Sequence, residues 1–382
     1  MDKISQVDDQ PAPGRLPALD GIRGVAIIWV VLHNALDQPT APATGAIRLV
    51  GALAHPGWIG VQLFFALSGF LITYGLLEAQ GSSGYFRNFY IRRALRILPL
   101  YYAVLLALFI VARVPWWHWP YSLQGQASLW LFAVNWTHTA PYGFAHFWSL
   151  AVEEQFYLLW PFVVWRLPPR HLFFWCIGIS AAVLCLRGFL VTYGADPWTL
   201  YSNTACRMDA LALGAAGACI ARESTWRTWM QLHSGRVLLV TAAIFVAGIP
   251  LTHIYDRYRA SGETVGYTLL ALCSAAFVVA VALESRGGKV AMLLSRTPLR
   301  SIGKYSYAIY VFHGIVNKLI GEPWLGVHVG PQPTAQVLLL YAAVLLGVSY
   351  ALGFCSYHLL EKHFLKLKTR FAPRPRNAAG AD

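Results

Sequence analysis

Residues 16–35 read LPALDGIRGVAIIWVVLHNA, an apolar segment that also carries Asp20, Arg23 and His33. A helix that crosses a membrane needs about 20 predominantly apolar residues, and every residue between Arg23 and His33 except Gly24 is apolar. An ionisable side chain inside a bilayer costs roughly 2.5 kcal/mol or more. Because the segment keeps such groups, it predicts chemistry inside a membrane, with His33 as the first candidate to perform it.

The composition of the 382-residue chain is that of a membrane protein. It is 57% hydrophobic and 12% charged, whereas a soluble domain is about a quarter charged. A net charge of +13 would favour nucleic-acid binding in a soluble protein, but the basic residues form short clusters between apolar spans. We therefore interpret them as topology signals and expect no nucleic-acid partner. The six cysteines show no CxxC pairing and are interpreted as small buried hydrophobes, and no ligand spacing suggests a metal site.

Ten apolar runs are long enough to span a bilayer. They lie near residues 20–37, 57–78, 95–114, 146–166, 171–192, 206–222, 236–255, 265–284, 303–322 and 335–359. The segment 127–137 is apolar but too short, and is interpreted as an interfacial or re-entrant piece. The sequence therefore predicts an all-α fold, a polytopic integral membrane helical bundle of about ten transmembrane helices.

Lys and Arg in the loops predict the orientation of the bundle. They are abundant in alternate loops and near both termini, whereas the intervening loops contain none over residues 115–145, 193–205 and 323–334. Since cytoplasmic loops carry the excess of Lys and Arg, both termini are predicted to be cytoplasmic. The loop after residue 255 breaks the pattern, with Arg257 and Arg259.

The chain is predicted to form one membrane domain over residues 16–370. Residues 1–15 and 371–382 are rich in Pro, Ala and charge, and we expect these cytoplasmic ends to be disordered. No cleavable signal peptide is visible, so the first span is expected to remain as a membrane anchor.

The polar residues of the first span fall at two depths. Asp20 and Arg23 are i, i+3 neighbours that can pair directly. His33 lies about 15 Å further along the axis and is rotated by roughly 80° from Arg23. A single histidine in a span is more often a hydrogen-bonded packing residue than a catalyst. Its depth near the middle of the membrane favours function, because a neutral imidazole can act as a general base for a hydroxyl.

A second polar group lies in FWSLAVEEQFYLLWP, residues 147–161. Its polar members are Ser149, Glu153, Glu154 and Gln155, and its expected aromatic anchors are Trp148 and Tyr157. Adjacent residues of a helix project about 100° apart, so we expect at most one of the two glutamates to face the bundle interior. Two interpretations stay open: a structural hydrogen-bonding knot between helices, or a catalytic or substrate-orienting role.

Three arginines lie close together in the segment FRNFYIRRALRILPLYY, residues 86–102, where a predicted cytoplasmic loop becomes the third span. They are Arg92, Arg93 and Arg96. One interpretation is topology signalling or binding of anionic lipid head groups. The other is a clamp for the phosphates of a soluble cytoplasmic ligand, because guanidinium groups suit phosphate.

Two further stretches place polar side chains in spans. RMDALALG puts Arg207 and Asp209 near the outer end of the shortest span, and YSYAIYVFHG puts His313 about midway through the ninth. A second histidine at a depth similar to that of His33 predicts a polar core in the bundle. We expect this core to face substrate or to hold the helices together, with Ser149, Gln155, Arg207, Asp209 and His313 as its members.

Taken together, these segments resemble acyltransferase family 3, the bacterial membrane O-acyltransferases that modify surface polysaccharides, lipopolysaccharide and some small glycosides. The matching stretches occur in family order: LDGIRGVAIIWVVLHN (19–34), FFALSGFLIT (64–73), RRALRILPLYY (92–102), FWSLAVEEQFYLLWP (147–161), RMDALALG (207–214), GKYSYAIYVFHG (303–314) and YHLLEKHF (357–364). The resemblance implies a ten-span acyltransferase domain in a bacterial inner membrane, with cytoplasmic termini.

The resemblance also implies roles for individual residues. Arg23 and His33 correspond to the arginine–histidine pair of the family, with the histidine as catalytic base and the arginine supporting developing negative charge. Glu153 falls in a glutamate-containing motif, and it or Asp20 would fix the tautomer of the base. The cytoplasmic arginine cluster of the family, implicated in handling the acyl donor, corresponds to Arg92, Arg93 and Arg96.

The chain departs from the family pattern at one point. The family usually places ten residues between its arginine and its histidine, whereas this chain has nine and carries Asn34 in the usual position. Because asparagine cannot act as a base, His33 stays the predicted base. Many relatives add an extracytoplasmic esterase-like domain after the last span, and we expect none here because the chain stops soon after that span.

The predicted function is transfer of an acyl group, expected to be acetyl, from cytoplasmic acyl-CoA to a hydroxyl of an envelope glycan or lipid-linked sugar. Acyl-CoA is then a donor substrate, membrane lipids surround the protein, and no permanently bound cofactor is expected. The alternative is a transporter of a sugar, lipid or acyl unit in which His33 and His313 relay protons. Buried ionisable residues disfavour a passive scaffold.

Overall fold

The computed structural model describes residues 16–36, 51–111, 122–137, 139–141, 143–252, 256–284, 288–329 and 334–371. These residues are helical almost throughout, and no strand occurs among them. The ends that we expect to be disordered, residues 1–15 and 371–382, lie outside the described residues apart from Phe371.

Long helices form the body of the described structure. They are α1 (Pro17–Leu36), α3 (Ile59–Ala79), α4 (Tyr85–Val111), α7 (Trp148–Arg166), α8 (Pro169–Thr192), α10 (Thr204–Arg222), α11 (Ser224–Thr252), α12 (Tyr267–Leu283) and α17 (Ala335–Ser356). The shorter helices are α5 (Leu123–Trp130), α6 (Val134–Thr137), α9 (Pro197–Ser202), α13 (Lys289–Leu294), α14 (Thr297–Lys304), α15 (Ser306–Val316), α16 (Glu322–His328) and α18 (Lys362–Leu367). The 3-10 turns are η2 (His55–Trp58), η3 (Ala145–Phe147) and η7 (Lys368–Phe371), and the π-helical turns are η4 (Gly262–Gly266), η5 (Asn317–Gly321) and η6 (Tyr357–Glu361).

Eight helical stretches of the described residues are long and apolar enough to cross a membrane. They are Pro17–Leu36, Gly51–Ala79, Tyr85–Ile110, Pro169–Thr192, Pro197–Arg222, Ser224–Gly248, Gly262–Leu283 and Gln336–Leu367. The prediction of an all-α, polytopic membrane bundle is confirmed. The other two predicted spans, 146–166 and 303–322, are helical but are not among the eight. The first is α7, which contains two glutamates and a glutamine, and the second breaks at Tyr305, between α14 and α15.

The centre of the bundle is built around α3, α10 and α12, which pack against one another and against α1 and α8. Small residues bring α3 and α10 together, because a Cβ at Gly69 would collide with the carbonyl oxygen of Leu211, and one at Gly214 with that of Ala66. Close approach through small residues is a common way for helices to pack in lipid, which offers no hydrophobic drive between them. The two glycines therefore fix the crossing that places the polar residues of α10.

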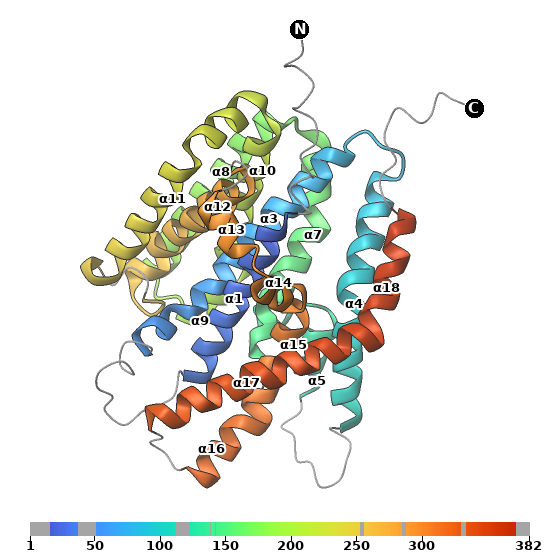
Figure 1. Cartoon of the computed structure of the whole chain (residues 1–382), viewed down its shortest axis with the longest axis vertical. Coiled ribbons are helices and arrows are strands. Elements are labelled where there is room, and N and C mark those ends of the chain that lie inside the picture. The colour runs from blue at the N-terminus through green and yellow to red at the C-terminus, as the bar shows by residue number, and fades with distance from the viewer. Residues whose placement is uncertain are drawn as a thin grey trace.

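The bundle has two distinct ends. Figure 1 shows α4 and α18 side by side along one edge, and the two helices are in contact. At the start of α4, the Arg87 guanidinium lies 5.9 Å from the ring centroid of Phe371 in η7. We call this end of the bundle, where the described chain also begins, the terminal end. The end at which α1 finishes at Leu36 is the opposite end.

A buried ion pair joins α8 to α10. Arg187 Nη2 lies 2.8 Å from Asp209 Oδ2, and both side chains are fully buried. Arg187 also donates to the carbonyl oxygen of Cys206, and Thr268 of α12 donates to Asp209 Oδ2 at 3.0 Å. Because a buried charge is costly unless it is paired and hydrogen-bonded, this network holds the three helices in one arrangement.

Arg187→Met should destabilise the protein by about 3–5 kcal/mol, because the substitution leaves the Asp209 carboxylate buried without its counterion. The double variant Arg187→Met/Asp209→Leu should recover most of the loss, since it removes the desolvation cost together with both charges. Unfolding in detergent micelles measures the two effects. A single variant as stable as the wild type, or a double variant no more stable than the single one, would contradict this account.

Candidate functional site

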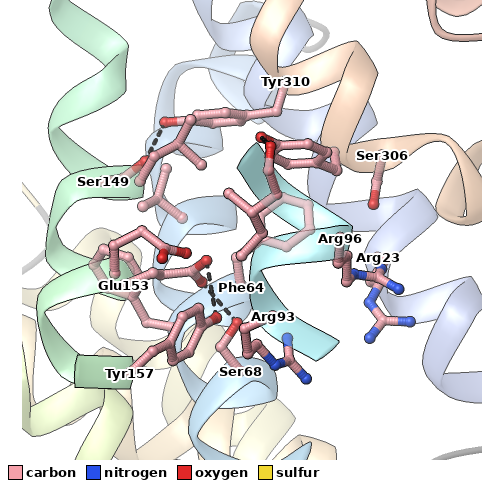
Figure 2. A pocket seen from close by; sticks show the side chains of 16 residues that line it. Arg23, Phe64, Ser68, Arg93, Arg96, Ser149, Glu153, Tyr157, Ser306 and Tyr310 are labelled. Carbon is pink, nitrogen blue, oxygen red and sulfur yellow. Dashed lines mark hydrogen bonds between the residues drawn. The ribbon is translucent and has the colours of Figure 1, made fainter. Parts of the chain in front are cut away.

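A pocket opens between α1, α3, α4, α7 and α15. Its empty volume, counting the space at its mouth, is about 760 Å³. Figure 2 shows three arginine side chains on one side of this pocket and the carboxylate of Glu153 on the other. The fold therefore brings together polar side chains that are far apart in the sequence, such as Arg23 and Tyr310, around one cavity, which we call the first pocket.

Two hydroxyl groups hold the Glu153 carboxylate of α7. Ser68 Oγ of α3 donates to Oε1 at 2.6 Å, and Tyr157 OH, one turn along α7, donates to Oε2 at 3.1 Å. The Arg93 guanidinium of α4 lies over the Tyr157 ring, 5.3 Å from its centroid. The Glu153 carboxylate is thus fixed on one wall of the first pocket, and the Arg93 guanidinium stacks on Tyr157, one of the two residues that hold it.

Two sequence-based interpretations of α7 are wrong. Glu153 and Glu154 both line the first pocket, although we expected at most one of them to face the interior. The pocket wraps around α7 far enough to reach side chains about 100° apart. Trp148 and Tyr157, expected as interfacial anchors, are only 3% and 4% exposed. Trp148 is buried because this part of α7 packs against α3, where the Phe65 ring meets it edge-on.

The predicted arginine cluster is divided between two pockets. Arg96 lines the first pocket together with Arg23 of α1, Arg92 lines a second pocket, and Arg93 lines both. Arg23 Nη1 donates to Asp20 Oδ1 at 2.6 Å, so these two residues of α1 form an ion pair. Arg93 is therefore the side chain that the two pockets share.

The second pocket has an apolar wall and a basic rim. Its empty volume is about 560 Å³, and residues of α3 between Leu71 and Ala79 form the wall. Arg92, Arg93 and Lys368 stand at the rim. A ligand with an apolar part and a negatively charged part suits such a surface.

Lys368 lies in η7, just beyond the last span, and adds to the positive charge of the arginine cluster. Burial, together with neighbouring guanidinium groups, lowers the pKa of Lys368 to about 7. In order of effect, these neighbours are Arg96, Arg93, Arg92 and Arg23. Positive charge is therefore crowded at the terminal end of the bundle, beside both pockets.

A chain of contacts connects Ser149, which lines the first pocket, to His146 and His313. Ser149 Oγ and Tyr310 OH are 2.6 Å apart, and Tyr310 OH donates to the carbonyl oxygen of His146 at 2.9 Å. The ring centroids of His146 and His313 are 5.0 Å apart. His313 is fully buried, and its Nδ1 lies 2.7 Å from the carbonyl oxygen of Tyr310. Since a carbonyl oxygen only accepts, Nδ1 carries the proton.

His33 lies apart from the first pocket. Its side chain is 4% exposed, and it is not among the residues that line the pocket. His33 Nε2 is 3.4 Å from Arg257 Nη1, and the rings of His33 and His55 have centroids 6.4 Å apart. Arg23 is about 15 Å away along α1. Among the described residues, Arg257 is a charged group beside this imidazole, whereas Arg23 and the carboxylates of the first pocket lie elsewhere.

Gln155 has the surroundings of a structural residue. Gln155 Nε2 donates to the carbonyl oxygen of Phe132 at 2.7 Å and to Asn135 Oδ1 at 3.0 Å, while Oε1 accepts from Trp136 Nε1 at 3.0 Å. These bonds tie the short segment of α5 and α6 to α7. The segment 127–137, too short to span a bilayer, is thus packed onto the bundle.

Arg207 of α10 is fully buried in a cage of aromatic rings. Its guanidinium carbon lies 4.5–5.9 Å from the ring centroids of Tyr267, Tyr201, Trp148 and Phe65. Its three nitrogens have no hydrogen-bond partner within the described part of the chain. Asp209, in contrast, is engaged by Arg187. Of these two residues of α10, Asp209 therefore belongs to an ion pair, whereas Arg207 is surrounded by aromatic rings.

Sequence reasoning missed several of these contacts. Arg187 carried a usable signal, because it is an arginine inside the apolar run AAVLCLRGFLV. Ser68 and Tyr310 carried none, since hydroxyl side chains are common in spans. Lys368 was counted only among the basic residues near the C-terminus, and Arg257 only as an exception to the loop pattern.

Comparisons with known proteins agree on one family. A family model described as an acyltransferase domain matches residues 16–354. The putative peptidoglycan O-acetyltransferase YrhL of Bacillus subtilis is 28% identical over 91% of this chain and 54% of its own length. The peptidoglycan O-acetyltransferase OatA of Listeria monocytogenes is 28% identical over 78% and 49%. The O-acetyltransferase OatA of Staphylococcus aureus is 28% identical over 81% and 52%.

The chain spans about half the length of these curated relatives. No solved structure matches it.

The lowered pKa of Lys368 predicts an amine that reacts at neutral pH. Only the unprotonated amine attacks an acylating reagent, so labelling of Lys368 should be half-maximal near pH 7, against about 10.4 for an ordinary lysine. Between these values the unfolded state binds more protons than the folded state, so stability should rise with pH, and Lys368→Met should flatten the rise. Mass spectrometry of labelled peptides and unfolding curves from pH 6 to about 10 measure both. Labelling that begins only near pH 10 would contradict the burial of this amine.

Proposed function

Because the chain belongs to the acyltransferase domain family, we propose that it transfers an acetyl group from cytoplasmic acetyl-CoA to a hydroxyl of a glycan or glycolipid of the bacterial cell envelope. The observation that carries the proposal is the pair of adjoining pockets at which arginines from two helices converge. The printed names of the relatives support an O-acetyl product and a glycan acceptor. The multi-pass bundle would lie in the cytoplasmic membrane, with the terminal end inside the cell.

The donor would bind at the terminal end. The phosphates of acyl-CoA would meet Arg92, Arg93 and Lys368 at the rim of the second pocket, and its adenine would rest on the apolar wall. Arg93 lines both pockets, so the pantetheine arm would pass it and enter the first pocket. There the thioester would lie between the arginines and the fixed carboxylate of Glu153.

The transfer itself needs a base for the acceptor hydroxyl, and His33 is the residue we propose. The hydroxyl oxygen attacks the thioester carbonyl carbon as its proton passes to His33 Nε2, the C–S bond breaks, and the CoA thiolate then takes that proton. His33 lies about 15 Å from Arg23 along α1. The acyl end of the donor must therefore travel beyond the first pocket to reach the base.

Arg93→Ala should weaken CoA binding by roughly 10–100-fold, because a charge-assisted hydrogen bond to phosphate is worth about 1.5–3 kcal/mol. Isothermal titration with CoA in detergent micelles measures the loss. Arg87→Ala is the matched control: this arginine lies on the same helix, stacks on Phe371 and lines neither pocket. A wild-type protein that binds no CoA would favour the transporter interpretation.

His33→Ala should lower the rate of acetyl transfer by about 10²–10⁴-fold, the usual contribution of a general base. CoA affinity should stay at the wild-type value, since His33 lies outside both pockets. Transfer of labelled acetyl from acetyl-CoA to envelope glycan in membrane vesicles measures the rate. A His33→Ala variant that acetylates glycan at the normal rate would remove the proposed base.

The acceptor is identified by mass spectrometry of envelope glycans from cells with and without the gene. Loss of the mass of one acetyl group from a defined sugar would report the acyl group and the acceptor together. Unchanged glycans and glycolipids would contradict the proposed function.

A further inference from the structure

Arg207 is a buried cation whose hydrogen-bond donors are unused among the described residues. Its side chain is fully buried, and Nε and both Nη atoms have no hydrogen-bond partner there. The four aromatic rings around its guanidinium stabilise the positive charge, but a ring face is at most a weak acceptor for an N–H group. An unsatisfied buried polar group is costly and calls for an explanation. A substrate atom that accepts hydrogen bonds would supply one.

One aromatic ring separates Arg207 from the first pocket. Phe65 of α3 lines that pocket, and the guanidinium carbon of Arg207 lies 5.9 Å from the centroid of the Phe65 ring. Trp148 of α7 meets Phe65 edge-on and lies 5.6 Å from the same carbon. The next two residues of α7, Ser149 and Leu150, line the pocket. A thioester that enters the first pocket therefore comes within one side chain of Arg207.

The opposite side of the aromatic cage lies against the surroundings of His33. The guanidinium carbon of Arg207 is 4.5 Å from the ring centroid of Tyr267, and the ring of Trp58 meets Tyr267 edge-on with centroids 5.6 Å apart. The residue before Trp58 is Gly57, which touches α1 so closely that a Cβ on it would lie 2.8 Å from Cβ of His33. Arg207 thus lies between the first pocket and the proposed base.

The proposed transfer needs a hydrogen-bond donor at the acetyl carbonyl. When the acceptor hydroxyl attacks, the carbonyl oxygen takes up negative charge, and donors that are already in place within a site that excludes water stabilise this charge. The sequence resemblance assigns that role to Arg23. Arg23 is instead bound to Asp20 at 2.6 Å and lies about 15 Å from His33 along α1. A reaction beside His33 therefore requires another donor.

We propose that Arg207 is a further catalytic residue of the acetyl transfer: its guanidinium donates hydrogen bonds to the carbonyl oxygen of the acetyl group and stabilises the oxyanion that forms there. The inference rests on the proposed function, with His33 as the base. To reach Arg207 from the first pocket, the acetyl group passes Phe65, whose ring turns aside.

The residues of the cage give the reaction the following course. The acceptor oxygen bonds to the carbonyl carbon while its proton passes to His33, and the electron pair of the C=O double bond moves to the oxygen that Arg207 binds. The C=O bond then forms again, the C–S bond breaks, and the CoA thiolate takes the proton from His33. Arg207 stays protonated throughout, as guanidinium groups do in proteins.

The test compares two donors, acetyl-CoA and its dithioester analogue, in which sulfur replaces the carbonyl oxygen. Sulfur is a weak hydrogen-bond acceptor, so the analogue gains little from a guanidinium. Arg207→Met should lower kcat with acetyl-CoA by about 10²–10³-fold, the usual loss for one donor to an oxyanion, and with the dithioester by roughly tenfold or less. CoA affinity should not change, since Arg207 lines neither pocket. Transfer of the labelled acyl group to envelope glycan in membrane vesicles measures both rates.

Arg222→Met is the matched control. Arg222 is an exposed arginine at the end of the same α10, and its guanidinium carbon lies 5.3 Å from the ring centroid of Tyr74. The variant removes the same charge and a comparable ring contact, so it should behave as wild type with both donors. A merely structural role for Arg207 would instead give equal losses with the two donors, because a distorted site slows both.

Two results would overturn the inference while leaving the proposed function intact: a wild-type kcat in Arg207→Met, or the same fractional loss with both donors. If Arg207→Met does not fold, as judged by CoA affinity and by unfolding in micelles, Arg207→Lys replaces it. The ratio of kcat with acetyl-CoA to kcat with the dithioester should then fall below that of wild type, and an unchanged ratio would overturn the inference. Wild-type protein that transfers no acetyl group from acetyl-CoA would count against the proposed function itself.

Discussion

The cost of placing charge in an apolar bundle governs this structure. Arg187 and Asp209 are tolerated because they meet at 2.8 Å and because a backbone carbonyl and a hydroxyl group form further hydrogen bonds with them. Arg207, two residues before Asp209 on the same α10, has aromatic faces around its guanidinium and no hydrogen-bond partner among the described residues. The ion pair of Arg187 with Asp209 therefore holds the helices in place. Arg207, in contrast, is a buried cation without an ion pair or a hydrogen bond among the described residues.

The sequence predicted the long helices well, because the length and hydropathy of an apolar run decide whether it can span a membrane. Spanning length and hydropathy are local, so most long helices were found, and α3 and α12 needed no knowledge of their neighbours. The stretch 303–322 was expected as one span but breaks at Tyr305 into α14 and α15. Its polar and aromatic side chains bond to other helices, as Tyr307 does to the carbonyl oxygen of Ile97. A one-dimensional pattern does not contain such contacts.

The candidate site was predicted in its residues but not in its grouping. Charged residues inside spans stand out, so Arg23, Arg93 and Glu153 were named, and the structure gathers them at one pocket. The partners that give them geometry, such as Ser68, carry no charge and no special spacing. At most one of Glu153 and Glu154 was expected to face the interior, because that expectation assumed a helix with a single buried face. The first pocket touches α7 over a wider arc, and only the packed structure shows this.

The nine-residue spacing on α1 has a physical consequence. A shift by one residue turns a side chain by about 100° around a helix. Asn34, in the position usual for the histidine, has its amide nitrogen 3.5 Å from His313 on α15. His33 points to another side of α1, where the segment before α12 supplies Arg257. The displaced imidazole therefore lies beside an arginine of this segment. Under the proposed function, His33 would serve an acceptor that approaches from the opposite end of the bundle, while the donor would meet the cations at the terminal end.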